Sequence, residues 1–194
     1  GETGDRRFAT ILDNLRNRYG YTLYSMMRRP RGTDRLPNGV TTGLFDALNE
    51  AVPADFDNPY FDKTSELGTG TTNDAFEMME VLSGTHYDEY LAVRLDWFNA
   101  LNHGVLKWAG GGSGHTWNAP QFVGSPRTWV HYTETSFNED TFLAAFASGQ
   151  SFVSTGPILD VTVGENVPGS TVSASGGQVT LNISVRAADW IPVE

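Results

Sequence analysis

The chain has 194 residues, of which 39% are hydrophobic, and it carries a formal net charge of −10 and no cysteine. This length is sufficient for one sizeable domain, or for one domain and a piece of another. The negative charge disfavours nucleic acid and anionic membranes as partners, because both require a positive protein surface. Without cysteine there are no disulfides or thiolate ligands, so any bound metal would be held by His, Asp and Glu.

The N-terminal segment is predicted to form a helix that ends near Tyr19, because apolar residues recur at spacings of three and four from residue 8 to residue 15 and Gly20 follows. A short β-prone run at 21–27 comes next and stops at a basic turn, 28–32. Residues 32–73 lack periodicity and are rich in Gly, Pro, Asn, Asp and Thr. A loop of this length inside a compact domain is usually functional or mobile.

The middle of the chain is predicted to alternate strands and helices. A buried strand is expected at 76–82 and a helix at 88–102, with its apolar face formed by Leu91, Leu95, Phe98 and Leu101. A short strand at 105–109 leads into the glycine-rich turn 110–114, which has the composition of a flexible linker. Another strand is expected at 128–132.

The last third of the chain is predicted to begin with a helix and to continue as antiparallel strands. Asn138 is a good capping residue, and the acids Glu139 and Asp140 suit the positive end of a helix that would end at Gly149. Runs of period two follow at 151–154, 158–163, 170–174 and 178–187. This pattern predicts the start of a β-sandwich, and since such a fold needs about seven strands, we expect the chain to be cut from a longer protein.

No run of about 18 apolar residues is present, so no membrane span is expected. The first residues, Gly1 to Gly4, look like a processed end. Zero cysteine fits both the cytosol and the cell envelope, and we favour a secreted or periplasmic location.

Four short stretches are more specific as an ordered set than any one of them alone. Residues 80–84 have the sequence Glu-Val-Leu-Ser-Gly, and residues 97–104 have Trp-Phe-Asn-Ala-Leu-Asn-His-Gly. Residues 126–130 have Pro-Arg-Thr-Trp-Val, and residues 148–157 have Ser-Gly-Gln-Ser-Phe-Val-Ser-Thr-Gly-Pro. This set resembles the C-terminal part of the CehA/McbA-like metallohydrolases of the PHP superfamily, and the resemblance covers most of residues 8–194.

The resemblance implies an α/β fold, with the C-terminal half of a PHP-type α/β barrel in residues 1–155 and the first strands of a truncated β-sandwich in residues 156–194. It also implies metal-dependent hydrolysis of phosphoesters or carbamate esters, in which a divalent Zn, Mn or Fe ion activates a bound water. The first ligands of this family come from an N-terminal His-x-His strand, and this sequence contains no such pair. The missing N-terminal part of the same protein is therefore a candidate partner.

Two further ligand positions can be compared residue by residue. The family turn Asn-His-Pro-Arg corresponds to residues 28–31, where Arg29 replaces the His, and a guanidinium cannot bind a cation. The family pair Asp-x-His corresponds to Ser113 and His115, with Ser113 in place of the carboxylate. The resemblance thus assigns His115 and the strand-end Glu80 as metal ligands, and Arg29 and Ser113 as degenerate ligand positions.

Structural roles compete with these assignments. A lone His such as His115 is more often a hydrogen-bonded structural residue, and Glu80 could be a carboxylate at the edge of the core. Arg31 and Arg127 are candidate substrate-binding residues, because guanidinium groups pair with phosphate or carboxylate. Alternatively, Arg31 forms a salt bridge with the acidic loop 46–62, and Arg127 pairs with a nearby acid.

Two functions stay open from sequence. The first is a hydrolase-derived domain that is impaired or inactive, and the second is a noncatalytic binding or structural module of a secreted or envelope multidomain protein. A small anionic or ester ligand fits both, whereas an enzyme needs roughly three or four converging His, Asp or Glu side chains. Three explanations stay open for the missing metal-ligand side chains: natural divergence, deliberate mutation, or an error in the sequence.

Overall fold

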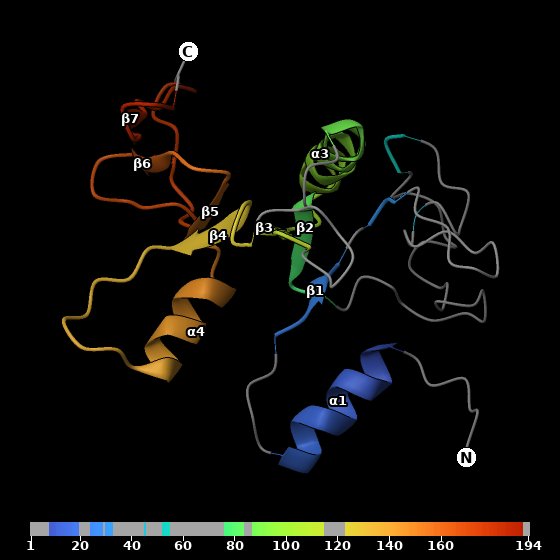
Figure 1. Ribbon diagram of the computed structural model, residues 1–194. Helices are drawn as coiled ribbons and strands as arrows, with labels where there is room; N and C mark the ends of the chain where they lie inside the picture. Colours follow the sequence, from blue (N-terminus) through green and yellow to red (C-terminus); the bar gives the residue numbers. More distant parts are fainter. Residues whose placement is uncertain are drawn as a thin grey trace. The chain divides into compact units, whose positions relative to one another are not determined.

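The computed structural model describes residues 8–19, 24–28, 30–32, 45, 52–54, 76–83, 87–114 and 123–191. The fold is mixed α/β, with parallel and antiparallel strand pairs (Figure 1). The described strands form one sheet of three strands and two sheets of two strands, and these do not close into a barrel. None of the helices in the described part is both long and apolar enough to cross a bilayer.

The chain divides into two compact units. The first contains Gly1–Val81 and Tyr87–Lys107, and the second contains Leu82–His86 and Trp108–Glu194. The predicted domain boundary after residue 155 falls inside the second unit.

The first unit contains helix α1 (Phe8–Tyr19), strand β1 (Met26–Met27) and helix α3 (Tyr87–Asn102). Strand β2 (Met78–Ser83) pairs with β1 in parallel, with Met26 opposite Met78. The predicted end of α1 near Tyr19 is confirmed. The prediction that the 76–82 strand is buried is confirmed as well, since the first four residues of β2 are all buried. The buried apolar residues of this unit are Met27, Phe45, Ala54, Phe76, Met78, Met79, Val81, Val93 and Ala100.

The predicted apolar face of α3 is wrong, although the helix itself forms as expected. Leu95 and Phe98 are 45% and 46% exposed, whereas Val93, Asp96 and Ala100 on another face are buried. The reason is Asp96, whose carboxylate pairs with an arginine in the interior of the unit. A buried carboxylate must keep such a partner, and this orients the helix.

A polar cluster joins α1, the segment before β1 and the residue before β2. Glu77 accepts hydrogen bonds from the Ser25 backbone N at 2.6 Å and from the Ser25 hydroxyl at 2.9 Å. Arg16 Nη2 lies 2.7 Å from the other carboxylate oxygen. Burial alone would raise the pKa of Glu77, but the hydrogen bonds from Ser25 and Arg16 outweigh it and leave the pKa below its ordinary value of 4.5.

Stability of the chain is expected to decrease as the pH falls through the folded pKa of Glu77. A carboxyl whose pKa is lower in the folded state stabilises that state above the unfolded pKa and loses this contribution as it is protonated. Urea unfolding between pH 7 and pH 3 should show a smaller loss for Glu77→Gln than for the unchanged chain. Glu134→Gln, at an exposed position, is the control and should keep the full slope; the same slope in Glu77→Gln would contradict the assignment.

The second unit contains strands β3 (Trp108–Gly112), β4 (Arg127–Val130) and β5 (Ser151–Ser154) and helix α4 (Glu139–Ala147). Strands β4 and β5 are antiparallel, with Trp129 opposite Phe152. The predicted cap of α4 is confirmed, because Asn138 Oδ1 accepts a hydrogen bond from Thr141 N at 2.9 Å. Gly149 follows the helix at φ +74°, a conformation that favours glycine.

The interpretation of residues 110–114 as a flexible linker is wrong, because Gly110 to Gly112 lie in β3. Gly111 N donates to Thr128 Oγ1 at 2.9 Å, and this hydroxyl donates back to Gly111 O at 3.0 Å. A Cβ on Gly111 would overlap Val153 Cγ1. Glycine at position 111 therefore lets β3 pack directly against the Val153 side chain.

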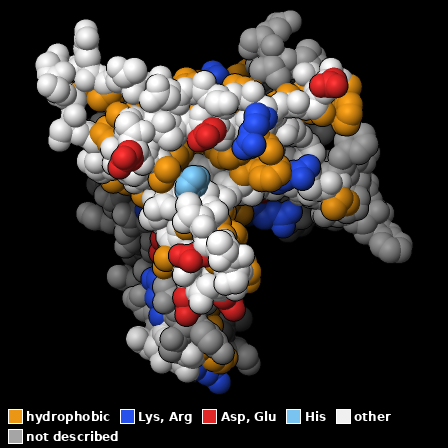
Figure 2. All heavy atoms as spheres, turned by 90° about the vertical axis from the view of Figure 1, so that its left-hand side faces the viewer, with side chains coloured by type: hydrophobic (Ala, Val, Ile, Leu, Met, Phe, Trp, Pro, Cys, Tyr) orange, Lys and Arg blue, Asp and Glu red, His pale blue; other side chains and the backbone are white. Residues whose placement is uncertain are grey.

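Strands β6 (Ile158–Thr162) and β7 (Asn182–Arg186) form an antiparallel pair. The strand expected at 170–174 is not formed; one isolated bridge, Ser175 to Gln178, lies beyond it. The expected antiparallel pairing is confirmed, but the burial does not alternate along β7, whose residues are all exposed; Ile183 and Val185 are 61% and 42% exposed. Figure 2 shows other hydrophobic side chains at the surface, among acidic and basic ones.

Candidate functional site

A buried ion pair in the first unit holds one of the predicted binding residues. Arg31 Nε lies 2.7 Å from Asp96 Oδ2, and Arg31 Nη2 lies 3.0 Å from Asp96 Oδ1. The two side chains are 6% and 0% exposed. Such bidentate, charge-assisted pairs are among the stronger polar contacts in proteins. The predicted salt bridge between Arg31 and the acidic loop 46–62 stays a prediction, because the acidic residues of that loop lie outside the described residues; the ion-pair partner that the structure describes is Asp96 of α3.

Further contacts extend this pair into a small network. Asp96 Oδ1 also accepts a hydrogen bond from Ala54 N at 2.7 Å, and Asn99 Nδ2 donates to Ala54 O at 2.8 Å. The Arg31 guanidinium lies 5.4 Å from the centre of the Phe45 ring. The network connects the basic turn, residue 54 and two successive turns of α3. The described contacts of Arg31 therefore hold segments of the fold together.

The predicted metal positions are described only in part. Glu80 lies in β2 and is 3% exposed, between the buried Met79 and Val81. Ser113 follows β3 and is half-buried, whereas His115 and Arg29 lie outside the described residues. Within the described part of the chain, no three His, Asp or Glu side chains gather as a metal site would require. Metal binding by His115 and Glu80 therefore stays a prediction.

Arg127 lies in the second unit, on an aromatic face of β4 and β5. Its guanidinium is 5.4 Å from the centre of the Trp129 ring. Trp129 in turn stacks on Phe152 across the strand pair, with ring centres 6.2 Å apart and planes 9° apart. Residues two apart on a strand share a face, so Arg127, Trp129 and His131 are placed together by the strand itself.

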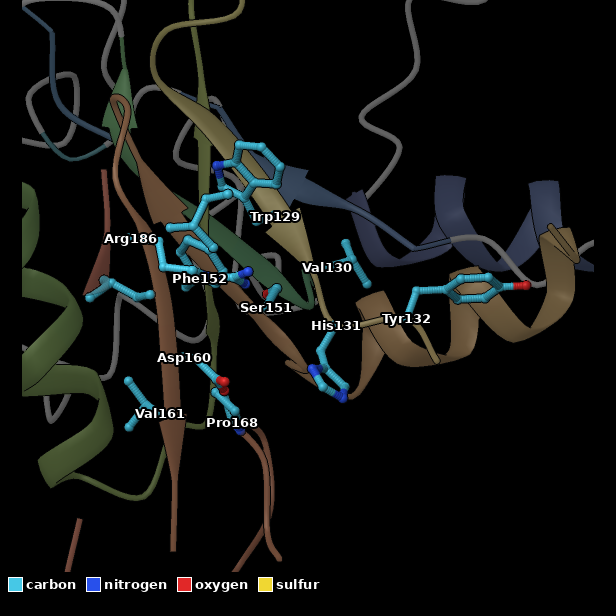
Figure 3. A pocket seen from close by; sticks show the side chains of 12 residues that line it. Trp129, Val130, His131, Tyr132, Ser151, Phe152, Asp160, Val161, Pro168 and Arg186 are labelled. Carbon is cyan, nitrogen blue, oxygen red and sulfur yellow. The ribbon is translucent and has the colours of Figure 1, made fainter. Parts of the chain in front are cut away.

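A pocket of about 340 Å³ in the second unit is bordered by this aromatic face (Figure 3). Residues of β4 and β5 form one wall and residues of β6 and β7 form the other. In Figure 3, Asp160 and Pro168 lie on one side and His131 and Ser151 on the other, while the Tyr132 side chain points away. The lining residues are Trp129, Val130, His131, Tyr132, Ser151, Phe152, Ile158, Leu159, Asp160, Val161, Pro168 and Arg186.

Several polar groups around the pocket have no partner among the described residues. The side chains of Asp160, Arg186 and Arg127 make no hydrogen bond or ion pair with any of them. Trp129 Nε1 is buried and also lacks a hydrogen-bond acceptor there. Ile158 is opposite Arg186 and Asp160 is opposite Ser184, so the acid and the base share one face of the strand pair, two positions apart.

Sequence reasoning identified Arg127 but missed this pocket. The alternation of Arg127, Trp129 and His131 was a usable signal, because it indicates one polar and aromatic strand face. The contribution of Asp160 and Arg186 depends on the pairing of β6 with β7, which no local pattern predicts.

No family model matches the chain, and neither a curated protein nor a solved structure is significantly similar to it.

Proposed function

We propose that the chain carries a hydrolase-derived domain of the CehA/McbA type whose metal-dependent activity is impaired or absent. In this proposal the chain corresponds to the C-terminal half of a PHP-type barrel followed by the opening strands of a β-sandwich. Arg29 and Ser113 occupy ligand positions that a divalent ion cannot use well, because one is cationic and the other a neutral hydroxyl.

The observation that carries this proposal is that the segments bearing the resemblance contact one another within each unit. In the first unit, Arg31 of the basic turn binds Asp96, directly before the Trp-Phe motif. In the second unit, the Pro-Arg-Thr strand pairs with the Ser-Phe-Val-Ser strand, Arg127 opposite Ser154. Motifs chosen for their order along the chain are thus neighbours in space, which supports an inherited scaffold.

A second candidate function is a noncatalytic binding module. The pocket of the second unit favours it, because Asp160 and Arg186 in its lining have no partner among the described residues, and neither Glu80 nor Ser113, the two described metal positions, lines it.

The test of the first proposal is repair of the metal site. The unchanged chain is expected to hold no stoichiometric Zn, Mn or Fe after dialysis and not to hydrolyse p-nitrophenyl phosphate or acetate. The double variant Arg29→His with Ser113→Asp should bind Zn²⁺ about tenfold more tightly than the unchanged chain in calorimetry, because it restores an imidazole and a carboxylate at the two ligand positions. A tenfold gain corresponds to about 1.4 kcal/mol of binding free energy.

The matched control is Arg28→His with Ser136→Asp, which introduces the same residue types at exposed positions and should leave Zn²⁺ affinity unchanged. A full metal equivalent in the unchanged chain would show an intact site and refute impairment. No gain in the repaired variant over this control would show that the residue correspondence is wrong.

A further inference from the structure

We propose that the pocket of the second unit binds a small organic monoanion, a carboxylate with an apolar body, which places its carboxylate on Arg186 and its body against Trp129 and Phe152. This inference names the ligand class of the noncatalytic binding module and rests on that candidate function. It involves none of the predicted metal positions, so metal analysis and ligand binding can fail separately.

The size and walls of the pocket fit such a ligand. Its volume of about 340 Å³ lies within the range of roughly 300–1,000 Å³ that is usual for small-molecule sites. Such sites are mostly apolar with a few polar groups that orient the ligand. Here the apolar surface comes from the stacked Trp129 and Phe152 rings and from Ile158, Leu159, Val161 and Pro168.

The charges around the pocket favour an anion. The Arg186 guanidinium lines it without an ion pair to the described residues, and Arg127 lies over the Trp129 ring beside it. A planar guanidinium binds a carboxylate through two parallel hydrogen bonds. Among the described lining residues, Arg186 faces one acidic residue, Asp160, and Arg127 adds a second guanidinium beside the pocket.

Asp160 limits the charge that the ligand can carry. Its carboxylate lies on the same strand face as Arg186, two positions away. A second negative charge on the ligand would be repelled by Asp160, because like charges at this separation destabilise each other. The pocket should therefore prefer a monoanionic carboxylate over a dianionic phosphate.

The indole of Trp129 is a further polar group near the pocket without a described partner. Its Nε1 is buried in the wall without an acceptor among the described residues, and a buried donor left unsatisfied costs about 1–3 kcal/mol.

The competing explanation is a direct pair between Arg186 and Asp160 in solution. Diagonal neighbours across two strands are within reach of long side chains. Exposed pairs of this type contribute only about 0–1 kcal/mol, so a carboxylate ligand could displace Asp160. If the direct pair dominates instead, the unchanged chain would not bind benzoate saturably, and only Asp160→Asn, which frees Arg186, would bind it.

The experiment titrates the full chain separately with benzoate, benzylamine and phenyl phosphate. Saturation-transfer NMR detects binding, and calorimetry measures the affinity. Benzoate is expected to bind saturably and more tightly than the other two. Arg186→Gln should weaken benzoate binding by about tenfold, the loss of a charge-assisted hydrogen-bond pair. Asp160→Asn should tighten benzoate binding by roughly threefold, because it removes the repulsion between the Asp160 carboxylate and the ligand carboxylate; a threefold change corresponds to about 0.6 kcal/mol.

Arg18→Gln, which removes an exposed arginine of α1, is the matched control and should leave benzoate affinity unchanged. The Asp160→Asn result keeps the test decisive if Arg186→Gln fails to fold, since the two variants have opposite expected effects. The inference is overturned if the unchanged chain shows no saturable benzoate binding, if benzylamine binds as tightly, or if neither pocket variant alters the affinity.

Discussion

Replacement of Asp96 by Ala is expected to lower the free energy of unfolding by about 3–5 kcal/mol, because it leaves the Arg31 guanidinium buried without its carboxylate. Both side chains are nearly inaccessible, at 6% and 0% exposure, so water cannot replace the lost partner. The backbone N of Ala54 would lose its acceptor as well. Urea unfolding followed by circular dichroism measures this loss.

Two comparisons make the Asp96 experiment specific. Asp189→Ala removes an exposed carboxylate and should stay within about 0.5 kcal/mol of the unchanged chain. Arg31→Met with Asp96→Leu removes both charges and should recover much of the stability, since apolar replacements of a buried ion pair are often neutral or better. A near-neutral effect of Asp96→Ala would mean that the pair does not form as described.

Gly169→Ala is expected to be nearly as destabilising, by about 3 kcal/mol or more. Gly169 has φ +87°, and a Cβ there would overlap Ser148 O and lie 2.8 Å from Gly149 C. Both contacts are with backbone, so no side-chain rotation can relieve them. Two contributions make up this loss. An alanine in the left-handed conformation costs about 1–2 kcal/mol, and overpacking costs about 1–3 kcal/mol.

The control for Gly169 is a glycine with the same backbone requirement and no crowding. Gly176 has φ +63° and nothing within 4 Å of the Cβ position. Gly176→Ala should therefore cost only the backbone part, about 1–2 kcal/mol. Equal losses in the two variants, measured by thermal unfolding, would show that close packing on Ser148 is not what requires Gly169.

Features of the fold that depend on neighbouring residues were predictable from sequence. The cap of α4 at Asn138 involves residues three apart, and the predicted helix start is observed. The inward face of α3 was not predictable, because it is chosen by the contact between Asp96 and Arg31, 65 residues away. Apolar periodicity alone pointed to Leu95 and Phe98, which are exposed.

The candidate sites likewise combine residues that a local pattern reveals with residues that only strand pairing brings together. Arg127 could be selected from a local motif, and the alternation around Trp129 was visible in the sequence. The pocket also requires Arg186, which reaches its position only because β7 pairs with β6 in a register that sets Arg186 opposite Ile158. Pairing between strands this far apart along the chain follows from packing of the whole unit rather than from any one segment.

The division of the chain has a practical consequence for truncation. The first unit is interrupted after Val81 and resumes at Tyr87, so Leu82–His86 belongs to the second unit. In that unit Leu82 O lies 3.3 Å from the Cβ position of Gly111, and a fragment that begins at Trp108 would lack this neighbour. Because no single cut separates the two units, we expect a fragment cut between them to lack part of one unit and to be less stable than the same residues within the whole chain.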